Sequence, residues 1–269
     1  MTLHLQVHGE SDSQPLVVLP SFGFDHSAMA TAIEPIFAEL PGWRRLYVDI
    51  PGTGNSPVHN PPQSDAILDV LVATIQAELH DSRFAMLGWS YGGYLAAGVT
   101  RRVPNQIGGL MLVCTGFKIR LRDRDLSGVL TSRPQQGWLN HVPSHLREHL
   151  IHAVGLQTGE VASRIISTLD ANGPTDEIYL TSLRADGFPL SDENEPTPCN
   201  APVCFLVGNR DRVVGYANLF DALGNYDYAS YTCISGAGHY LPLEQPAVFA
   251  TITKGWLEQC KPFVDPSAD

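Results

Sequence analysis

The sequence has few basic residues and few cysteines. Lysine and arginine number 17 against 28 aspartate and glutamate residues, so the formal net charge is −11. This balance argues against a nucleic-acid-binding protein, which needs a basic face to neutralise phosphates, and against a polybasic membrane anchor. The five cysteines form no C-x-x-C pair, so the sequence indicates neither a disulfide framework nor a zinc-finger site.

Long hydrophobic runs are also missing. No apolar run approaches the roughly 20 residues that a membrane span needs, and the start lacks the basic and apolar regions of a signal peptide. We therefore expect a cytoplasmic protein without membrane contact. Hydrophobic residues still make up 43% of the 269 residues, which suffices for a large core. The length suits one large domain with an insertion, or a little under two ordinary domains.

Short, nearly continuous apolar runs recur along the chain. They lie at residues 16–19, 45–49, 84–88, 110–114 and 203–208. Such runs are typical of strands covered on both faces, as in a parallel sheet. An amphipathic helix separates two of them, with apolar residues spaced three and four apart from Ile67 to Leu79 and Asp65 as its expected N-cap. This alternation predicts an α/β fold, a mostly parallel sheet flanked by helices.

The alternation breaks between Thr115 and Pro198. This stretch has no strand-like run but offers helical segments near residues 144–154, 159–171 and 175–185. We therefore predict a core formed by residues 1–114 and 199–269, with residues 115–198 inserted as a helical cap or lid.

One segment has the pattern of a nucleophile elbow. Gly88-Trp89-Ser90-Tyr91-Gly92-Gly93 follows the predicted strand at 84–88 and precedes a helical stretch. This is G-x-S-x-G in the strand–turn–helix setting that such an elbow requires. A serine turned sharply off a strand needs small neighbours two residues before and after it, and Gly88 and Gly92 meet that need. We expect Ser90 to be a catalytic nucleophile.

A serine hydroxyl needs a base to take its proton, and the base needs an orienting group. The partners expected for this elbow are an acid and then a histidine later in the chain. Asp211 follows the predicted strand at 203–208, and His239 follows a strand-like segment at 229–234. His239 is the only histidine after Asp211, so chain order selects it as the expected base.

These residues resemble the α/β-hydrolase superfamily over nearly the whole chain. The turn at residues 49–56 is similar to the superfamily's D-x-P-G-x-G-x-S, and Asp211 and His239 stand in its G-x-x-D-x-V and G-x-G-H contexts. The elbow and cap are further similar to those of pimeloyl-carrier methyl ester esterases. The resemblance implies an α/β-hydrolase fold and a nucleophilic serine, not the carboxylate of haloalkane dehalogenases and epoxide hydrolases.

The resemblance also implies an oxyanion hole formed by the backbone N–H groups of Tyr91 and Phe22. Many relatives carry His-Gly before the second of these residues, whereas this chain has Pro20-Ser21 before Phe22. The donor needed is a backbone amide, which any residue but proline supplies. The aromatic residues Trp89 and Tyr240, near the elbow and the histidine, are expected to line the substrate pocket.

Two further clusters have weaker signals. His145, His149 and His152 would lie near one face of a helix, a geometry that can bind a metal, but no H-E-x-x-H motif is present and we expect no metal or other cofactor. Residues 118–124 form the one concentrated basic run. Such a run is usually a solvated surface, and the alternative is that it guides an anionic carrier to the pocket.

The sequence thus predicts a serine hydrolase for a carboxylic ester, thioester or lactone, with a small-molecule substrate that is free or carrier-linked. The alternatives keep the fold but change the chemistry, to a lyase, another carbon–carbon bond catalyst or a ligand receptor. An aminopeptidase is the third reading. It needs acidic residues for the free amine, and the cap offers Glu148, Glu160, Asp176 and Glu177.

Overall fold

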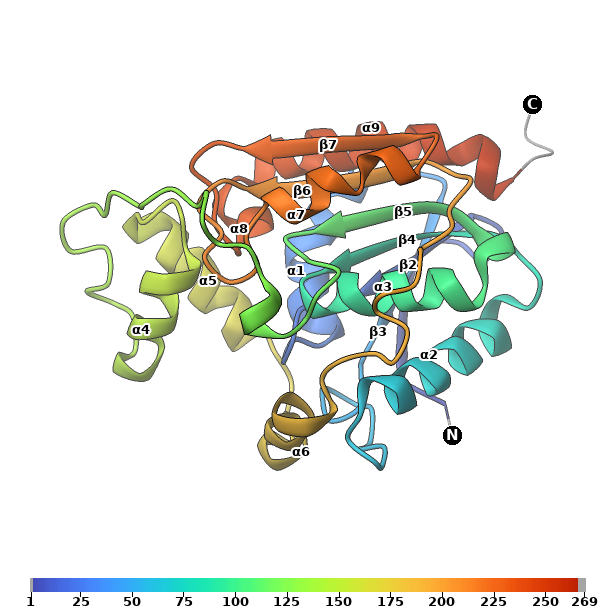
Figure 1. Ribbon diagram of the computed structural model, residues 1–269, viewed down its shortest axis with the longest axis horizontal. Helices are drawn as coiled ribbons and strands as arrows, with labels where there is room; N and C mark the ends of the chain where they lie inside the picture. The colour runs from blue at the N-terminus through green and yellow to red at the C-terminus, as the bar shows by residue number, and fades with distance from the viewer. Residues whose placement is uncertain (1, 266–269) are drawn as a thin grey trace.

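A central seven-stranded sheet organises the chain in the computed structural model, which describes residues 2–265 (Figure 1). The strand order is β1-β3-β2-β4-β5-β6-β7. β1 runs antiparallel to β3, and every other neighbouring pair is parallel. The strands are β1 (Leu5–His8), β2 (Gln14–Leu19), β3 (Trp43–Val48), β4 (Phe84–Trp89), β5 (Ile107–Val113), β6 (Val203–Gly208) and β7 (Ala229–Ile234).

Helices cover both faces of this sheet. They are α1 (His26–Phe37), α2 (Ser64–Leu79), α3 (Tyr91–Arg102), α4 (Ser144–Ala153), α5 (Gly159–Asp170), α6 (Glu177–Ser182), α7 (Ala217–Asp221), α8 (Leu241–Glu244) and α9 (Pro246–Val264). Short turns of other helix types lie at η1 (Pro104–Gln106), η2 (Leu121–Asp123), η3 (Leu183–Gly187) and η4 (Leu223–Asn225). None of the helices within residues 2–265 is long and apolar enough to cross a bilayer.

The central strands are apolar along their buried stretches because both faces of the sheet are covered there. In β2, Leu16 and Val18 pack into the cluster that contains α1, α8 and α9, whereas Val17 and Leu19 pack into the cluster that contains α2 and α3. All four side chains are fully buried. The predicted parallel sheet is thus confirmed, and its continuous apolar runs have the expected physical cause.

The start of α2 differs from the prediction. The N-cap is Gln63, and Asp65 lies inside the first turn. The Asp65 carboxylate accepts hydrogen bonds from the backbone N–H and the hydroxyl of Ser191. The Asp65 carboxylate, which the sequence predicted as a helix cap, is therefore engaged in a contact with a residue 126 positions later in the chain.

Between β5 and β6 the chain contains α4, α5 and α6, with α6 continuing into the π-helical turn η3. These positions agree with the predicted helical segments. We call residues 115–198 the cap segment, after the predicted division of the chain. In Figure 1, α4 and α5 lie beyond the arrowheads of the parallel strands, the edge at which the carboxyl ends of the strands meet.

Asp25 ties the cap segment to the core. One carboxylate oxygen caps α1 by accepting from the N–H groups of Ser27 and Ala28. The other accepts from the N–H of Gly173 at 2.7 Å, in the connection between α5 and α6. The side chain of Asn172 adds two hydrogen bonds, to the Asp25 N–H and the Gly23 carbonyl. A single buried carboxylate thus binds both the first turn of α1 and the loop between α5 and α6.

We expect Asp25→Ala to lower the free energy of unfolding by about 2–4 kcal/mol, because it leaves three N–H groups of this junction without their acceptor. Asp25→Asn retains one acceptor oxygen and should lose about half as much. Urea denaturation measures both. Asp69→Ala, on a mostly exposed side chain, is the control and should change the value by less than about 0.5 kcal/mol. Equal, small losses in all three variants would contradict the assigned role.

Candidate functional site

Ser90 occupies a sharp turn between β4 and α3. Its φ of 57° lies in the left-handed region that non-glycine residues rarely adopt. A Cβ on Gly88 would stand 2.4 Å from the Gly92 carbonyl oxygen, and one on Gly92 would stand 2.4 Å from the Leu19 carbonyl oxygen. Only glycine fits at either position, so the spacing of G-x-S-x-G follows from close backbone contact within the turn and with the end of β2.

Ser90, His239 and Asp211 form a continuous hydrogen-bonded chain. The Ser90 Oγ lies 2.8 Å from the His239 Nε2, and the His239 Nδ1 lies 2.9 Å from the Asp211 Oδ2. The three residues follow β4, β7 and β6, whose carboxyl ends meet at one edge of the sheet. Asp211 is fully buried and His239 is 6% exposed. This arrangement lets the imidazole accept the serine proton while the carboxylate holds the ring.

The carboxylate of Asp211 is itself held in place. Its Oδ1 accepts from the N–H groups of Val213 and Val214 at 2.8 and 3.0 Å, which leaves Oδ2 for His239. Ser90 is fixed in the same way, since its N–H donates to the Val113 carbonyl and its carbonyl accepts from the Thr115 hydroxyl. Ser90 and Asp211, at the two ends of this hydrogen-bonded series, are therefore both held in place by hydrogen bonds that involve backbone groups.

Glu244, which the sequence analysis missed, holds the loop that contains His239. Its carboxylate accepts from the N–H groups of Gly238 and Tyr240, on either side of His239. It also accepts from the N–H groups of Gly155 and Leu156 in the cap segment. Burial raises the pKa of Glu244 to about 7, although the donating backbone groups lower it. The only sign of this role in the sequence is that Glu244 comes five residues after His239.

Trp89 does not line the pocket, contrary to the prediction. Its side chain is 1% exposed and lies behind the site, where Nε1 donates to the His239 carbonyl at 2.9 Å. The ring packs edge-on against Tyr240. Because Trp89 belongs to β4, its side chain points into the core, while the turn one residue later exposes Ser90.

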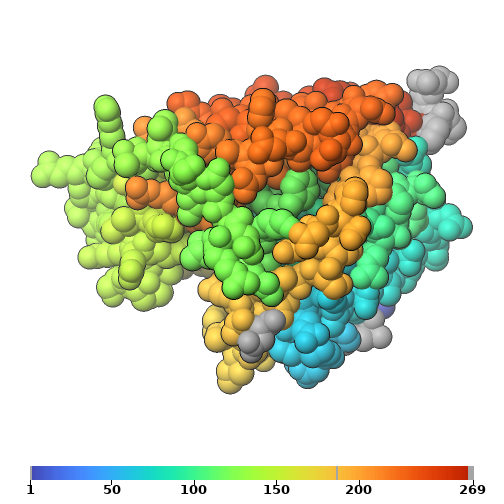
Figure 2. Space-filling model, in the orientation of Figure 1, coloured from blue at the N-terminus to red at the C-terminus, as the bar shows by residue number. Residues whose placement is uncertain are grey.

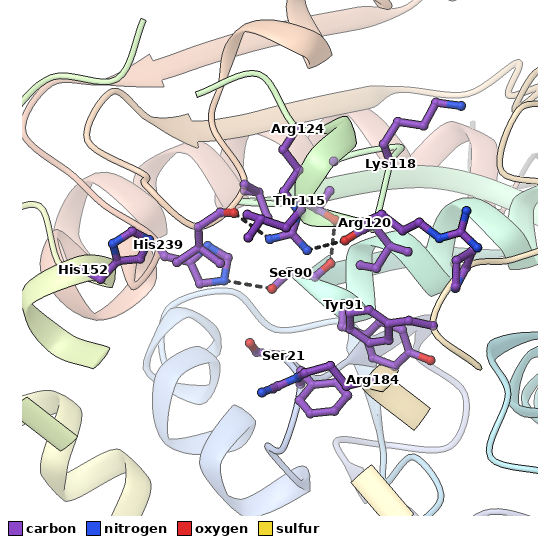
Figure 3. Close-up of a pocket in the computed structure, with 18 of the residues that line it drawn as sticks. Ser21, Ser90, Tyr91, Thr115, Lys118, Arg120, Arg124, His152, Arg184 and His239 are labelled. Carbon is purple, nitrogen blue, oxygen red and sulfur yellow. Dashed lines mark hydrogen bonds between the residues drawn. The ribbon is translucent and has the colours of Figure 1, made fainter. Parts of the chain in front are cut away.

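A cavity of about 770 Å³ opens above Ser90 and His239 (Figure 3). Its aromatic wall contains Phe22, Tyr91, Phe188 and Tyr240, so three of the residues expected at the site do border it. The Phe22 and Tyr91 rings meet edge-on at 5.6 Å, and Phe188 stacks on Tyr91 at 5.0 Å. The cap segment contributes Phe188 and most of the remaining lining, from residues 115–124, α4 and η3.

Basic side chains dominate the polar part of this cavity. They are Lys118, Arg120, Arg122, Arg124, Arg184, His149 and His152. The basic run at residues 118–124 was visible in the sequence, but its position beside Ser90 was not. Arg184 had no local signal, because it reaches the cavity only through the fold of η3.

The cap histidines do not gather at one place. His149 and His152 line the cavity, His141 borders a second, smaller cavity, and His145 is exposed and borders neither. The His149 Nε2 lies 2.9 Å from the Tyr240 hydroxyl, and burial lowers the pKa of His149. Within residues 2–265, three potential metal ligands lie within 4.8 Å of one another at His4, His26 and Asp49, not at these histidines. The Asp49 carboxylate there already accepts from two backbone N–H groups.

The four acidic cap residues considered for amine binding lie outside the cavity lining. Glu160 pairs with Arg164, Asp176 caps α6 and Glu177 accepts from Thr175. Glu148 is exposed. Among the described side chains that line the cavity, none is acidic.

Comparison with known families gives a match over residues 16–252 to the alpha/beta hydrolase family. The chain belongs to this family. A pimeloyl-[acyl-carrier protein] methyl ester esterase from Legionella pneumophila is 23% identical over 253 residues, which covers 94% of this chain and 98% of that protein. A protein of the same name from Shewanella woodyi is 33% identical over 114 residues, covering 42% of this chain and 40% of the relative.

Solved structures of other proteins have the same fold. An alpha/beta superfamily hydrolase from Oenococcus oeni superposes with a TM-score of 0.87 at 20% identity, covering 97% of this chain and all of that one. An enol-lactonase from Burkholderia xenovorans gives a TM-score of 0.71 at 19% identity, covering 95% and 96%. At these identities the likeness shows the fold.

Glu244 predicts a pH dependence of stability. Its pKa of about 7 in the folded protein lies above the ordinary value of 4.5, so between these values the folded state binds the extra proton. The free energy of unfolding should therefore lose this contribution as the pH rises from about 5 through 7. The loss is up to about 3 kcal/mol.

Urea denaturation between pH 5 and 8 tests this prediction on wild type and Glu244→Gln. The difference in free energy of unfolding, wild type minus variant, should fall as the pH rises. Glu258→Gln, at an exposed position in α9, is the control and should follow the wild-type curve. A difference that stays constant or grows with pH would refute the assignment.

Proposed function

We propose that this protein is a serine hydrolase that cleaves a carboxylic ester, or a related thioester or lactone, through an acyl-enzyme. The observation that carries the proposal is the hydrogen-bonded chain from Asp211 through His239 to Ser90, which ends in a cavity large enough for a small or medium acyl group. Such a chain turns a weakly nucleophilic hydroxyl into one that can attack a carbonyl.

In the first step the Ser90 Oγ attacks the carbonyl carbon while the His239 Nε2 takes the hydroxyl proton. The carbonyl π electrons move to its oxygen, which the backbone N–H groups of Tyr91 and Phe22 would stabilise as the oxyanion hole. The intermediate collapses as the alcohol leaves, and His239 returns the proton to it. Asp211 stabilises the imidazolium that forms between these events.

In the second step water replaces the alcohol. His239 takes a proton from the water, whose oxygen attacks the acyl carbon, and the free acid leaves as Ser90 regains its proton. The sum is ester plus water to acid plus alcohol, and the residues named supply every proton transfer, so the mechanism calls for no cofactor. The cap segment, residues 115–198, would act as the lid that excludes bulk water.

The names of the relatives support an ester substrate, since the two reported above are methyl ester esterases acting on a carrier-linked acyl group. A free small-molecule ester fits the same mechanism. A site for a free amine, as in an aminopeptidase, would need carboxylates, and the cavity presents guanidinium groups instead. A lyase or ligand receptor of the same fold differs in outcome, because neither would show sustained ester turnover.

Replacing Ser90 by Ala should lower turnover of short-chain p-nitrophenyl esters by about 10⁴-fold or more, because the attacking atom is removed. Intact-mass analysis after treatment with a fluorophosphonate should show one adduct on the wild type and none on Ser90→Ala. Ser82→Ala, at an exposed serine just before β4, is the matched control and should keep both the adduct and the turnover.

The two readouts separate the alternatives. An adduct without ester turnover would favour a non-hydrolytic member of the fold with an activated serine. No adduct on folded wild type would overturn the proposed nucleophile.

A further inference from the structure

The cavity beside Ser90 concentrates positive charge in an otherwise acidic protein. Five of the 17 lysine and arginine residues line this one cavity, although the whole chain has a net charge of −11. They come from two segments, residues 118–124 and η3, that lie more than 50 residues apart in the sequence but share the cavity. Figure 2 shows the green segment that follows β5 lying next to the yellow segment around α6.

Most of these cations lack a counter-ion among the side chains that the structure describes. Arg122 pairs with Asp123, but Lys118, Arg120, Arg124 and Arg184 make no ion pair with any described carboxylate. Lys118 contacts the neutral side chain of Asn194. A positive field without matching carboxylates is unfavourable by itself and attracts an anion into the cavity.

Arg124 lines the cavity with its side-chain nitrogens already bonded or buried. Its two terminal nitrogens donate to the carbonyls of Val213 and Ile119, and its Nε is buried without a partner. Its guanidinium is thus held by backbone groups near the site, and burial lowers its pKa, as expected for a desolvated cation. The carbonyls fix its position but do not neutralise it.

Arg184 combines exposure with a fixed orientation beside the site. It is exposed and has no hydrogen-bond or ion-pair partner among the described side chains. Its guanidinium carbon lies 4.3 Å above the centre of the Phe22 ring. That ring contacts Tyr91, the residue directly after Ser90. In the view of Figure 3, Arg184 and Arg124 lie on either side of Ser90.

We propose that the cavity binds esters that carry a second, anionic group, and that this group is a carboxylate held by Arg184 within the field of Arg120 and Arg124. The simplest such substrates are half-esters of dicarboxylic acids. The inference rests on the proposed ester hydrolysis and adds the class of acyl group that the cavity selects.

A carboxylate fits these observations through its geometry and charge. A guanidinium fork pairs with the two carboxylate oxygens in parallel hydrogen bonds, and its stacking on Phe22 orients the fork. The aromatic wall of Phe22, Tyr91 and Phe188 would hold the chain between the two ends of the substrate.

The test compares two substrates that differ only in charge, p-nitrophenyl hydrogen adipate and the p-nitrophenyl ester of adipamic acid. The amide replaces the carboxylate at nearly constant size. We expect kcat/KM of wild type to favour the carboxylate by about tenfold or more. The preference should shrink at about 0.5 M salt, because exposed charges are screened.

Arg184→Gln should lower the ratio of the two kcat/KM values by about fivefold or more, and Arg120→Gln/Arg184→Gln should lower it further. Arg133→Gln removes an exposed cation of the cap segment that lies outside the cavity, and it should keep the wild-type ratio. A p-nitrophenyl ester whose far end is a phosphonate instead of a carboxylate tests whether the cavity prefers that anion. A higher kcat/KM for it would overturn the carboxylate assignment.

No preference in wild type, or a preference that both arginine variants retain, would overturn the inference. Fluorophosphonate labelling of the same preparations keeps the two proposals apart. If Ser90 is labelled but the charged ester has no advantage, the inference fails and the serine hydrolase stands. If no adduct forms on folded protein, the proposed function fails first.

Discussion

The turn that places Ser90 depends on backbone groups approaching within contact distance. The left-handed φ of this residue directs its side chain out of the sheet, and the turn closes only because Gly88 and Gly92 have no Cβ to collide with neighbouring carbonyls. Trp89 fills the core one residue before the turn. The position of the serine hydroxyl, the start of α3 and the floor of the cavity all follow from this constraint.

The cap segment and the histidine loop share a second close contact. The His239 N–H donates to the Ala153 carbonyl at 2.7 Å, and the carboxylate of Glu244 bonds backbone groups of both segments. A Cβ on Gly238 would stand 2.3 Å from the Gly155 nitrogen. The base of the proposed mechanism is therefore held by the segment that also forms a wall of the cavity, so the two cannot move independently near α4.

The charge around the cavity is opposite in sign to the net charge of the chain. The net charge of −11 argued against a nucleic-acid-binding surface and a polybasic membrane anchor, yet the cavity collects cations from residues 118–124 and from η3. Composition averages over the surface, whereas binding depends on the field at one place. The sequence analysis left the basic run either as a solvated surface or as a guide for an anionic carrier, because net charge does not place it beside Ser90. The prediction of Trp89 as a pocket residue was wrong because Trp89 ends β4 with its side chain in the core, one residue before the turn that exposes Ser90.

The sequence by itself determined the features that local chemistry encodes. These are the parallel strands with their continuous apolar runs, the cap helices with their 3.6-residue period, and the G-x-S-x-G turn. It also ordered Ser90, Asp211 and His239 along the chain. The tertiary structure alone decided the 2.8 and 2.9 Å contacts between these three residues and the hydrogen bonds by which Glu244 holds the histidine loop. It also decided that Asp65 bonds Ser191 and that Arg184 lines the cavity. Periodicity and turn chemistry act over a few residues, whereas these contacts join segments that only the folded sheet brings together.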